Sequence, residues 1–191
     1  MSGNYFTNPL IFLIQTILGT FGLLVLLRFL FQLVQADFYN PVSQFLVTVT
    51  GPALRPLRRV IPGTSGLDLA SLVLAWLVKA LELFLVILLS GWGIRLGVLA
   101  WAIPEIIEML INIFLVAIII QVVLSWIAPG SGFNPVLSLI YDLAELVLEP
   151  ARSLIPPFEG IDFSPLVASV GLVLLKMLLL PPIKYLTGSP F

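Results

Sequence analysis

Four long apolar runs constrain this chain more than any other feature of its sequence. They cover residues 10–34, 67–89, 106–127 and 166–186. A helix needs about 20 mostly apolar residues, each rising about 1.5 Å, to cross the hydrocarbon core of a bilayer. Each run is long enough, and the chain as a whole is 60% hydrophobic and only 10% charged. The sequence therefore predicts an all-α membrane protein with about four transmembrane helices.

The chain contains neither His nor Cys, which removes several kinds of chemistry. Imidazole bases, thiolate nucleophiles, disulfides and the usual zinc ligands all depend on these two residues. The 9 basic and 10 acidic residues nearly cancel, so no long-range field gathers nucleic acid. We therefore expect no catalytic, cofactor-binding or metal-binding residues and no nucleic-acid partner. The expected surroundings are the lipid bilayer, with a membrane-protein partner or a homo-oligomer as the candidate assemblies.

The second constraint is an internal duplication with an offset of 94 residues, as in Asn134 against Asn40. In both halves the matching residues begin just after one apolar run and end inside the next. Two spans per half give the halves the same orientation, as in parallel repeats. Each repeat is therefore predicted to consist of one span, an amphipathic connector and a second span. The main duplicated positions are Asn40, Pro41, Pro56, Arg58, Pro62, Gly66 and Asp68, and then Asn134, Pro135, Pro150, Arg152, Pro156, Gly160 and Asp162.

We divide the chain into a first repeat (1–90), a linker (91–104) and a second repeat (105–191). The linker region holds a shorter apolar run with three glycines and Arg95, which stops at Pro104. We interpret it as a linker, with a re-entrant segment as the alternative, rather than as a fifth span. Glu105 and Glu108 would then lie at the start of the third span, where the helix dipole favours negative charge.

The duplicated residues resemble the YggT (YlmG-like) family of bacterial and plastid membrane proteins. The pattern is Asn-Pro, then Pro-x-Arg, x-x-Ile-Pro and Gly-x-Asp before an apolar span, and it lies within 37–72 and again within 126–166. With the flanking spans, the resemblance covers most of the chain. It implies two tandem repeats in a family without a defined biochemical activity. That family is associated with osmotic or cation tolerance, with cell division and nucleoid placement, and with cytochrome maturation in plastids.

Asn40 and Asn134 each precede a proline and therefore predict the start of a helix. Asn is a favoured N-cap, and Pro suits the first helical position. After Asn134, apolar and acidic residues fall on separate faces at helical spacing, which predicts an amphipathic helix. In the first half the same pattern begins, but Gly51-Pro52 is expected to break it early. The later duplicated prolines are expected to fix the turns that lead back into the membrane.

Asp68 and Asp162 lie just before the second and fourth spans. The favoured interpretation is N-capping, where a carboxylate also meets the positive end of the helix dipole. The alternative is a cation or proton site with one carboxylate per half. Arg58 and Arg152 would either neutralise these carboxylates or bind lipid phosphate.

The connectors differ in charge, being basic in the first half and acidic in the second, with Arg55 opposite Glu149 in the alignment. Either these charges pair between the halves, or each faces water or lipid headgroups. We favour the second, because exposed ion pairs contribute only about 0–1 kcal/mol. Since Lys and Arg mark the cytoplasmic side, connectors 35–66 and 128–161 are expected in the cytoplasm and both termini outside.

Lys79, Glu82 and Lys176 lie deep in the predicted spans. An ionisable group there costs at least about 2.5–3.5 kcal/mol on insertion scales, so each needs a partner. Because Glu82 is equivalent to Lys176 in the duplication, we predict an ion pair between spans two and four. Lys79, three residues before Glu82 on the same face, is the alternative partner. We favour a structural role over an ion or proton pathway, and expect Arg28 to extend to the headgroups.

Together these features favour a non-enzymatic inner-membrane protein that acts as a scaffold or assembly factor. The resemblance links it to osmotic or cation tolerance or to envelope and division processes. The alternative is a component of an oligomeric ion transporter or channel that uses the intramembrane Lys and Glu residues and the paired Asp residues. An oligomer would be required because four spans leave little room for a pathway within one protomer.

Overall fold

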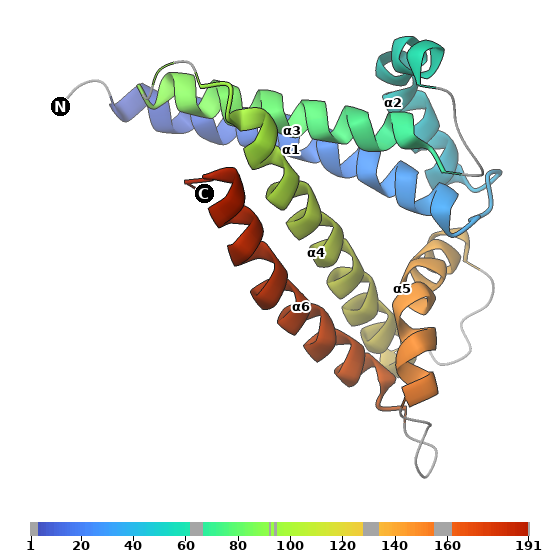
Figure 1. Ribbon diagram of the computed structural model, residues 1–191. Helices are drawn as coiled ribbons and strands as arrows, with labels where there is room; N and C mark the ends of the chain where they lie inside the picture. Colours follow the sequence, from blue (N-terminus) through green and yellow to red (C-terminus); the bar gives the residue numbers. More distant parts are fainter. Residues whose placement is uncertain are drawn as a thin grey trace.

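The computed structural model is all-helical in the part of the chain that it describes, residues 4–61, 67–91, 93, 95–127, 134–154 and 162–190 (Figure 1). Four helices are long and apolar enough to cross a membrane, and two shorter ones are amphipathic. The predicted all-α fold with four spans is therefore confirmed. The helices are α1 (Asn4–Leu33), α2 (Pro41–Val60), α3 (Leu69–Leu89), α4 (Val98–Ile127), α5 (Pro135–Leu154) and α6 (Ser164–Thr187).

Each repeat is a hairpin of two spans joined through an amphipathic helix (Figure 1). The spans α1 and α3 run antiparallel, as do α4 and α6, with α2 and α5 at the turns. The two amphipathic helices each have 20 residues, and both their starts (135 − 41) and their ends (154 − 60) are 94 positions apart. Both termini lie at the end of the molecule away from α2 and α5. The two connectors therefore share one side, as parallel repeats require.

The amphipathic helices bury their apolar faces against the spans. Leu46 and Leu54 of α2 are almost fully buried, as are Leu139 and Leu148 of α5, and they join a core built around Leu26 of α1. Burying one such side chain contributes about 1.5–3 kcal/mol. The outer faces of the spans remain apolar and exposed in the isolated chain, which suits contact with lipid.

The expected linker at 91–104 is too long, because α4 already begins at Val98. The first turn of α4 is held by Trp101, which is buried and whose Nε1 donates to the carbonyl of Thr187 at 2.9 Å. Pro104 lies inside the helix and is also buried. Membrane helices tolerate an internal proline when neighbouring helices pack over it and satisfy the freed carbonyl. Residues 98–104 thus belong to the helix that forms the third candidate span.

The predicted early break of the first amphipathic helix is also wrong. The helix α2 continues through Gly51 and Pro52 to Val60. The buried side chains of Leu46 and Leu54 lie two helical turns apart on one face, so packing holds the helix on both sides of the proline. The ribbon of α2 changes direction along its length, as expected of a helix with internal prolines (Figure 1).

Candidate functional site

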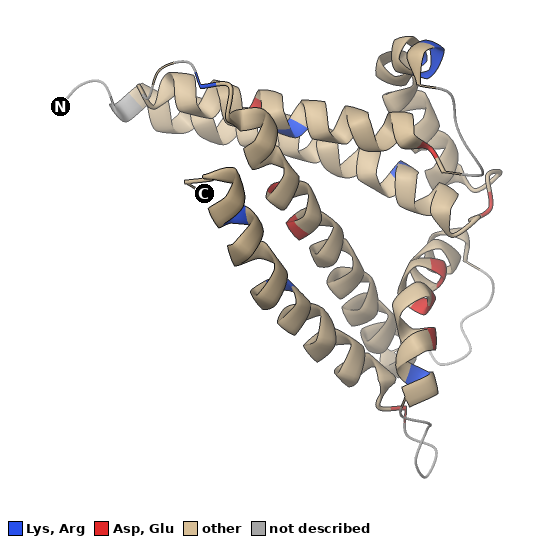
Figure 2. Cartoon of the chain, in the orientation of Figure 1, with Lys and Arg blue, Asp and Glu red and all other residues tan. Residues whose placement is uncertain are grey.

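The charged residues gather in two places (Figure 2). One group lies within the bilayer-spanning helices, where α3, α4 and α6 meet. The other lies at the connector end of the molecule, where α2 carries basic residues and α5 carries acidic ones.

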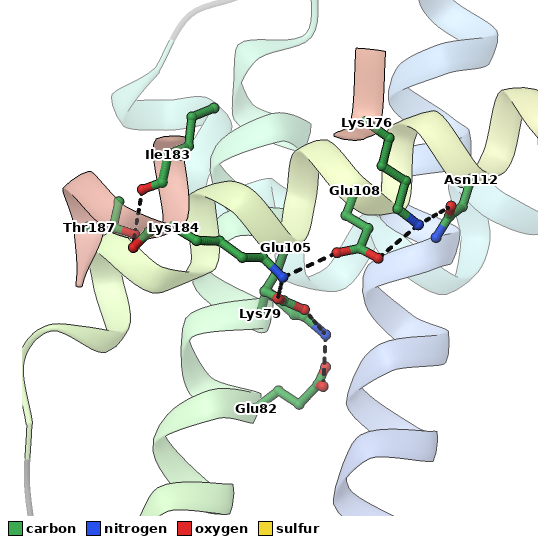
Figure 3. A network of polar contacts seen from close by, with 9 residues as sticks. All are labelled: Lys79, Glu82, Glu105, Glu108, Asn112, Lys176, Ile183, Lys184 and Thr187. Carbon is green, nitrogen blue, oxygen red and sulfur yellow. Dashed lines mark hydrogen bonds and ion pairs between the residues drawn. The ribbon is translucent and has the colours of Figure 1, made fainter. Parts of the chain in front are cut away.

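The intramembrane group is a continuous chain of ion pairs (Figure 3). It begins on α3, where Lys79 Nζ lies 2.8 Å from Glu82 Oε1. The same ammonium group lies 3.9 Å from Glu105 Oε2 of α4. Glu105 Oε1 in turn lies 3.4 Å from Lys184 Nζ of α6.

The chain of contacts continues along α4 and α6 (Figure 3). Lys184 Nζ lies 3.4 Å from Glu108 Oε2, and Lys176 Nζ lies 2.9 Å from Glu108 Oε1. Lys176 also donates to Asn112 Oδ1 at 3.1 Å. Three lysines and three glutamates form this network, so its formal charges cancel. It joins the last span of the first repeat to both spans of the second.

The predicted pair of Glu82 with Lys176 is not formed. Glu82 binds Lys79, the alternative partner, and Lys176 binds Glu108. The reason is that α4 packs against both α3 and α6 and supplies the carboxylates between them. The dipole interpretation of Glu105 and Glu108 is wrong as well. They lie seven and ten positions beyond Val98, outside the first turn in which the helix dipole acts.

Glu82 is the most enclosed carboxylate of the network, with 4% of its surface exposed. Its Oε1 binds Lys79, while its buried Oε2 has no hydrogen-bond partner among the described residues. That oxygen lies against the backbone of α1, since a Cβ placed on Gly19 would stand 3.7 Å from it. Among the described residues, it is the one carboxylate oxygen of the network without a hydrogen bond or an ion pair.

At the connector end, the first repeat places Arg58 against Asp68. Arg58 Nη2 lies 2.5 Å from Asp68 Oδ2, and Asp68 is buried. Asp68 is the N-cap of α3, and it accepts hydrogen bonds from the backbone N–H and the hydroxyl of Ser71. Burial raises the pKa of Asp68, but the hydrogen bonds from Ser71 and Arg58 together bring it below its ordinary value. This carboxylate is therefore ionised and serves as both cap and counter-ion.

The second repeat makes the equivalent pair in a more open setting. Arg152 Nε lies 3.0 Å from Asp162 Oδ2, and Arg152 Nη1 lies 2.5 Å from Glu145 Oε2. Asp162 Oδ1 accepts the backbone N–H of Ser164 at 2.8 Å, although the N-cap itself is Phe163. In both halves the duplicated arginine thus neutralises the duplicated aspartate.

The two asparagines cap their helices in the same way. Asn40 Oδ1 accepts the N–H of Val42, and Asn134 Oδ1 accepts that of Val136, each at 2.9 Å. Asn40 also donates through Nδ2 to the carbonyl of Pro135, at the start of α5. The sequence gives no sign of this link between the repeats, because helix capping alone accounts for an Asn-Pro pair.

Within the described ranges, no ion pair joins Arg55 to Glu149, and the connector-end ion pairs stay within each repeat, in line with the favoured interpretation. The expectation for the duplicated prolines is corrected. Pro56 and Pro150 lie inside α2 and α5 rather than in turns. The remaining duplicated positions lie outside the described residues, and they are Pro62, Gly66, Pro156 and Gly160.

Arg28 ties α1 to α2. Its Nη1 donates to Thr50 Oγ1 at 2.7 Å and to the carbonyl of Val47 at 3.3 Å. Beside it lies a cavity of about 580 Å³ between α1, α2 and the start of α3, which we call the first-repeat cavity. Its polar lining includes Arg28, Ser43, Arg58 and Asp68.

A cavity of about 780 Å³, which we call the second-repeat cavity, lies beside the duplicated ion pair of the second repeat, mainly between α4 and the start of α6. Arg152 and Asp162 line it as Arg58 and Asp68 line the first. At the position equivalent to Arg28, 94 residues later, this cavity has Val122. The two cavities therefore share the duplicated ion pair but differ in charge and in the helices that form most of their walls.

Comparison with known proteins agrees with the duplicated architecture. The family model described as CCB3/YggT matches residues 7–89 and again 100–183. An uncharacterised protein of Pseudomonas aeruginosa is 45% identical over 183 residues, which cover 94% of this chain and 92% of that protein. The uncharacterised protein YggT of Escherichia coli is 37% identical over 175 residues, covering 89% and 88%. No solved structure matches this chain.

Proposed function

This chain belongs to the CCB3/YggT family of membrane proteins, and from that premise we propose that it is a non-enzymatic scaffold or assembly factor of the bacterial inner membrane. The observation that carries the proposal is the pair of oppositely charged connector helices on one side of the molecule. Arg55 and Arg59 of α2 are exposed, as are Asp142 and Glu149 of α5, and none has an ion-pair partner in the described part of the chain.

Unpaired charges of opposite sign suit recognition of a partner more than they suit stability. Exposed charges add little to folding, but complementary potentials orient and select partners. The charges within the membrane act differently, because they satisfy one another in a neutral network across α3, α4 and α6. That network supports the role of a rigid platform that presents α2 and α5.

Photo-crosslinking in native membranes tests this proposal. A photoreactive residue at position 59 or 149 should give discrete protein adducts, either with another membrane protein or with a second copy of the chain. The same residue at position 177 is the control, because Met177 lies on the apolar outer face of α6. Arg55→Glu should abolish the adducts from position 59 while the level of folded protein stays normal. Lipid adducts alone from both connector positions would contradict the proposal.

We place the connectors in the cytoplasm on the strength of the arginines of α2. Single-cysteine labelling tests this directly, since the chain has no native Cys. Cysteines introduced at positions 55 and 59 should resist a membrane-impermeant reagent in intact cells and react after permeabilisation. A cysteine at Ser189, beyond the last span, should show the opposite pattern. Labelling of position 55 from outside would refute the orientation.

A second candidate function is ion handling by an oligomer, and the free Oε2 of buried Glu82 favours it. Reconstitution into liposomes with K⁺, Na⁺ and H⁺ flux readouts distinguishes the two candidates. The scaffold proposal expects no flux above that of empty liposomes. A flux that Glu82→Gln removes, with the fold retained, would support ion handling and displace the scaffold.

A further inference from the structure

We propose that the first-repeat cavity binds the phosphate of an anionic phospholipid, held between Arg28 and Arg58 with Ser43 as a third donor. The inference is independent of the partner that the connector helices recognise. It rests on the donors that line the cavity, on the charge of that lining and on the place of the cavity in the membrane.

The two guanidinium groups have unused donors. Arg28 makes both of its hydrogen bonds to α2 through Nη1, which leaves Nε and Nη2 without a partner among the described residues. Arg58 binds Asp68 through Nη2 alone. A guanidinium group presents five N–H donors in a planar fork that fits a phosphate group. The cavity therefore offers enough donors for phosphate without breaking the contacts that hold α2.

Ser43 supplies an independent sign that a polar ligand belongs here. Its side chain lines the cavity and is 7% exposed, and its Oγ is buried without a hydrogen-bond partner in the described structure. A buried hydroxyl without a partner loses its hydrogen bonds to water, so such groups are rarely left unsatisfied. A phosphate oxygen in the cavity would accept from this hydroxyl.

The charge of the lining favours an anion in one repeat only. The first-repeat cavity has two arginines against Asp68, an excess of one positive charge (2 − 1). The second-repeat cavity has Arg152 against Asp162, which cancel (1 − 1), and Val122 stands in place of Arg28. The second-repeat cavity is thus an internal control that has the same duplicated ion pair and no excess charge, although α4 and α6 form most of its wall.

The rest of the lining favours a lipid over free phosphate. Apolar side chains form most of the wall, including Phe31, Leu46 and Val47. Residues at the connector end of α1 and in α2 line the cavity, so it lies where a span meets an amphipathic helix and where headgroups are expected. Glycerol and acyl carbons would cover the apolar wall, whereas inorganic phosphate would leave it bare.

Lipid binding to the full chain in detergent tests the proposal. Native mass spectrometry measures retained lipid, and thermal unfolding measures stabilisation, with phosphatidylglycerol, phosphatidylcholine or inorganic phosphate added. We expect phosphatidylglycerol to bind and to raise Tm, and we expect the other two to do neither. Stabilisation by inorganic phosphate that competes with phosphatidylglycerol would overturn the lipid assignment. Equal binding of both phospholipids would overturn the anion site.

The duplication provides matched variants. Arg58→Gln should weaken phosphatidylglycerol binding about tenfold, the size expected for one charge-assisted contact. Arg152→Gln removes the equivalent ion pair from the second repeat and should leave binding unchanged. If both variants lose binding equally, the site is not in the first-repeat cavity.

A second variant, Ser43→Asp, tests the site without removing the ion pair between Arg58 and Asp68, so lost binding cannot be attributed to the loss of that pair. It places a carboxylate in the cavity wall among the two arginines, so the fold should be kept and the phosphate excluded. A folded Ser43→Asp protein that binds phosphatidylglycerol as well as the parent chain would overturn the proposal.

Discussion

The ion-pair network predicts unequal costs for removing its members, and Lys79→Met is the most informative change. Lys79 is the only partner of Glu82 in the described chain, and the side chains of the two residues are 13% and 5% exposed. Removing the lysine leaves an enclosed carboxylate without any counter-ion. By analogy with buried pairs elsewhere, the free energy of unfolding should fall by about 3–5 kcal/mol.

The other single changes should cost less, because their partners keep a second contact. After Glu82→Gln, Lys79 still has Glu105 at 3.9 Å, and after Lys176→Met, Glu108 still has Lys184 at 3.4 Å. A lost hydrogen bond to a charged group is worth about 1.5–3 kcal/mol. The order of stability should therefore be parent, then these two variants, then Lys79→Met.

Unfolding in mixed micelles of mild and denaturing detergent, followed by the fluorescence of the four tryptophans, gives the free energies. The double variant Lys79→Met/Glu82→Gln should regain much of the stability lost in Lys79→Met. The pair Glu82 and Lys176 should be additive, which makes it the control cycle. Strong coupling of Glu82 with Lys176, or equal costs for Lys79→Met and Lys176→Met, would refute this reasoning.

Three further predictions concern the connector end. Asn40→Ala should cost more than Asn134→Ala in unfolding experiments, since both lose a cap worth about 1 kcal/mol but only Asn40 also donates to α5. Because the pKa of Asp68 is lowered in the fold, it contributes stability above its unfolded pKa, and that contribution is lost as pH falls through the folded pKa. The drop in unfolding free energy on acidification should therefore shrink in Asp68→Asn. Thr50→Val, which keeps the shape but removes an acceptor of Arg28, should destabilise the chain by about 1–3 kcal/mol in the same measurement.

Much of the fold was predictable because its signals are local. Apolar runs of sufficient length identify spans, and an Asn-Pro pair identifies the start of α2 and of α5. The errors arose where packing overrides a local signal. The local signals at Pro104 and Pro52 predict an interrupted helix, yet α4 and α2 pass through them. Pro104 is buried, whereas Pro52 is exposed and α2 is held by the packing of Leu46 and Leu54 on either side of it.

The sequence predicts which charged residues belong to the site, but only some of the ion pairs that they form. The duplication leaves two roles open for Arg58 and Arg152, neutralising the duplicated aspartates or binding lipid phosphate, and the structure places each arginine against its aspartate. The duplication puts Glu82 and Lys176 at the same depth in their spans, which predicts that they pair. Depth alone, however, does not determine which face of each helix lies against its neighbour. The actual partner of Lys176 is Glu108 of α4. The sequence places Glu108 near the predicted start of a helix, where the helix dipole accounts for its charge, so nothing in the sequence indicates that it binds a lysine.

Two positions change the charge around the duplicated Arg–Asp pair between the repeats, and one of them yields a final prediction. Arg28 is replaced by Val122, and Gly51 is replaced by Glu145, which binds Arg152 seven residues later at 2.5 Å. No atom lies within 4 Å of a Cβ built on Gly51, so Gly51→Glu fits without displacing a neighbour.

In Gly51→Glu the new carboxylate should reach Arg58 as Glu145 reaches its own arginine. Replacing a glycine inside a helix with a good helix former adds about 1 kcal/mol to the free energy of unfolding. The same carboxylate cancels the positive excess of the first-repeat cavity, so phosphatidylglycerol should bind more weakly even though the protein is more stable. Gly51→Ala is the control, because it gives the gain in helix propensity without the charge and should leave lipid binding intact. Equal lipid binding by the two variants would show that the charge difference between the repeats does not select the ligand.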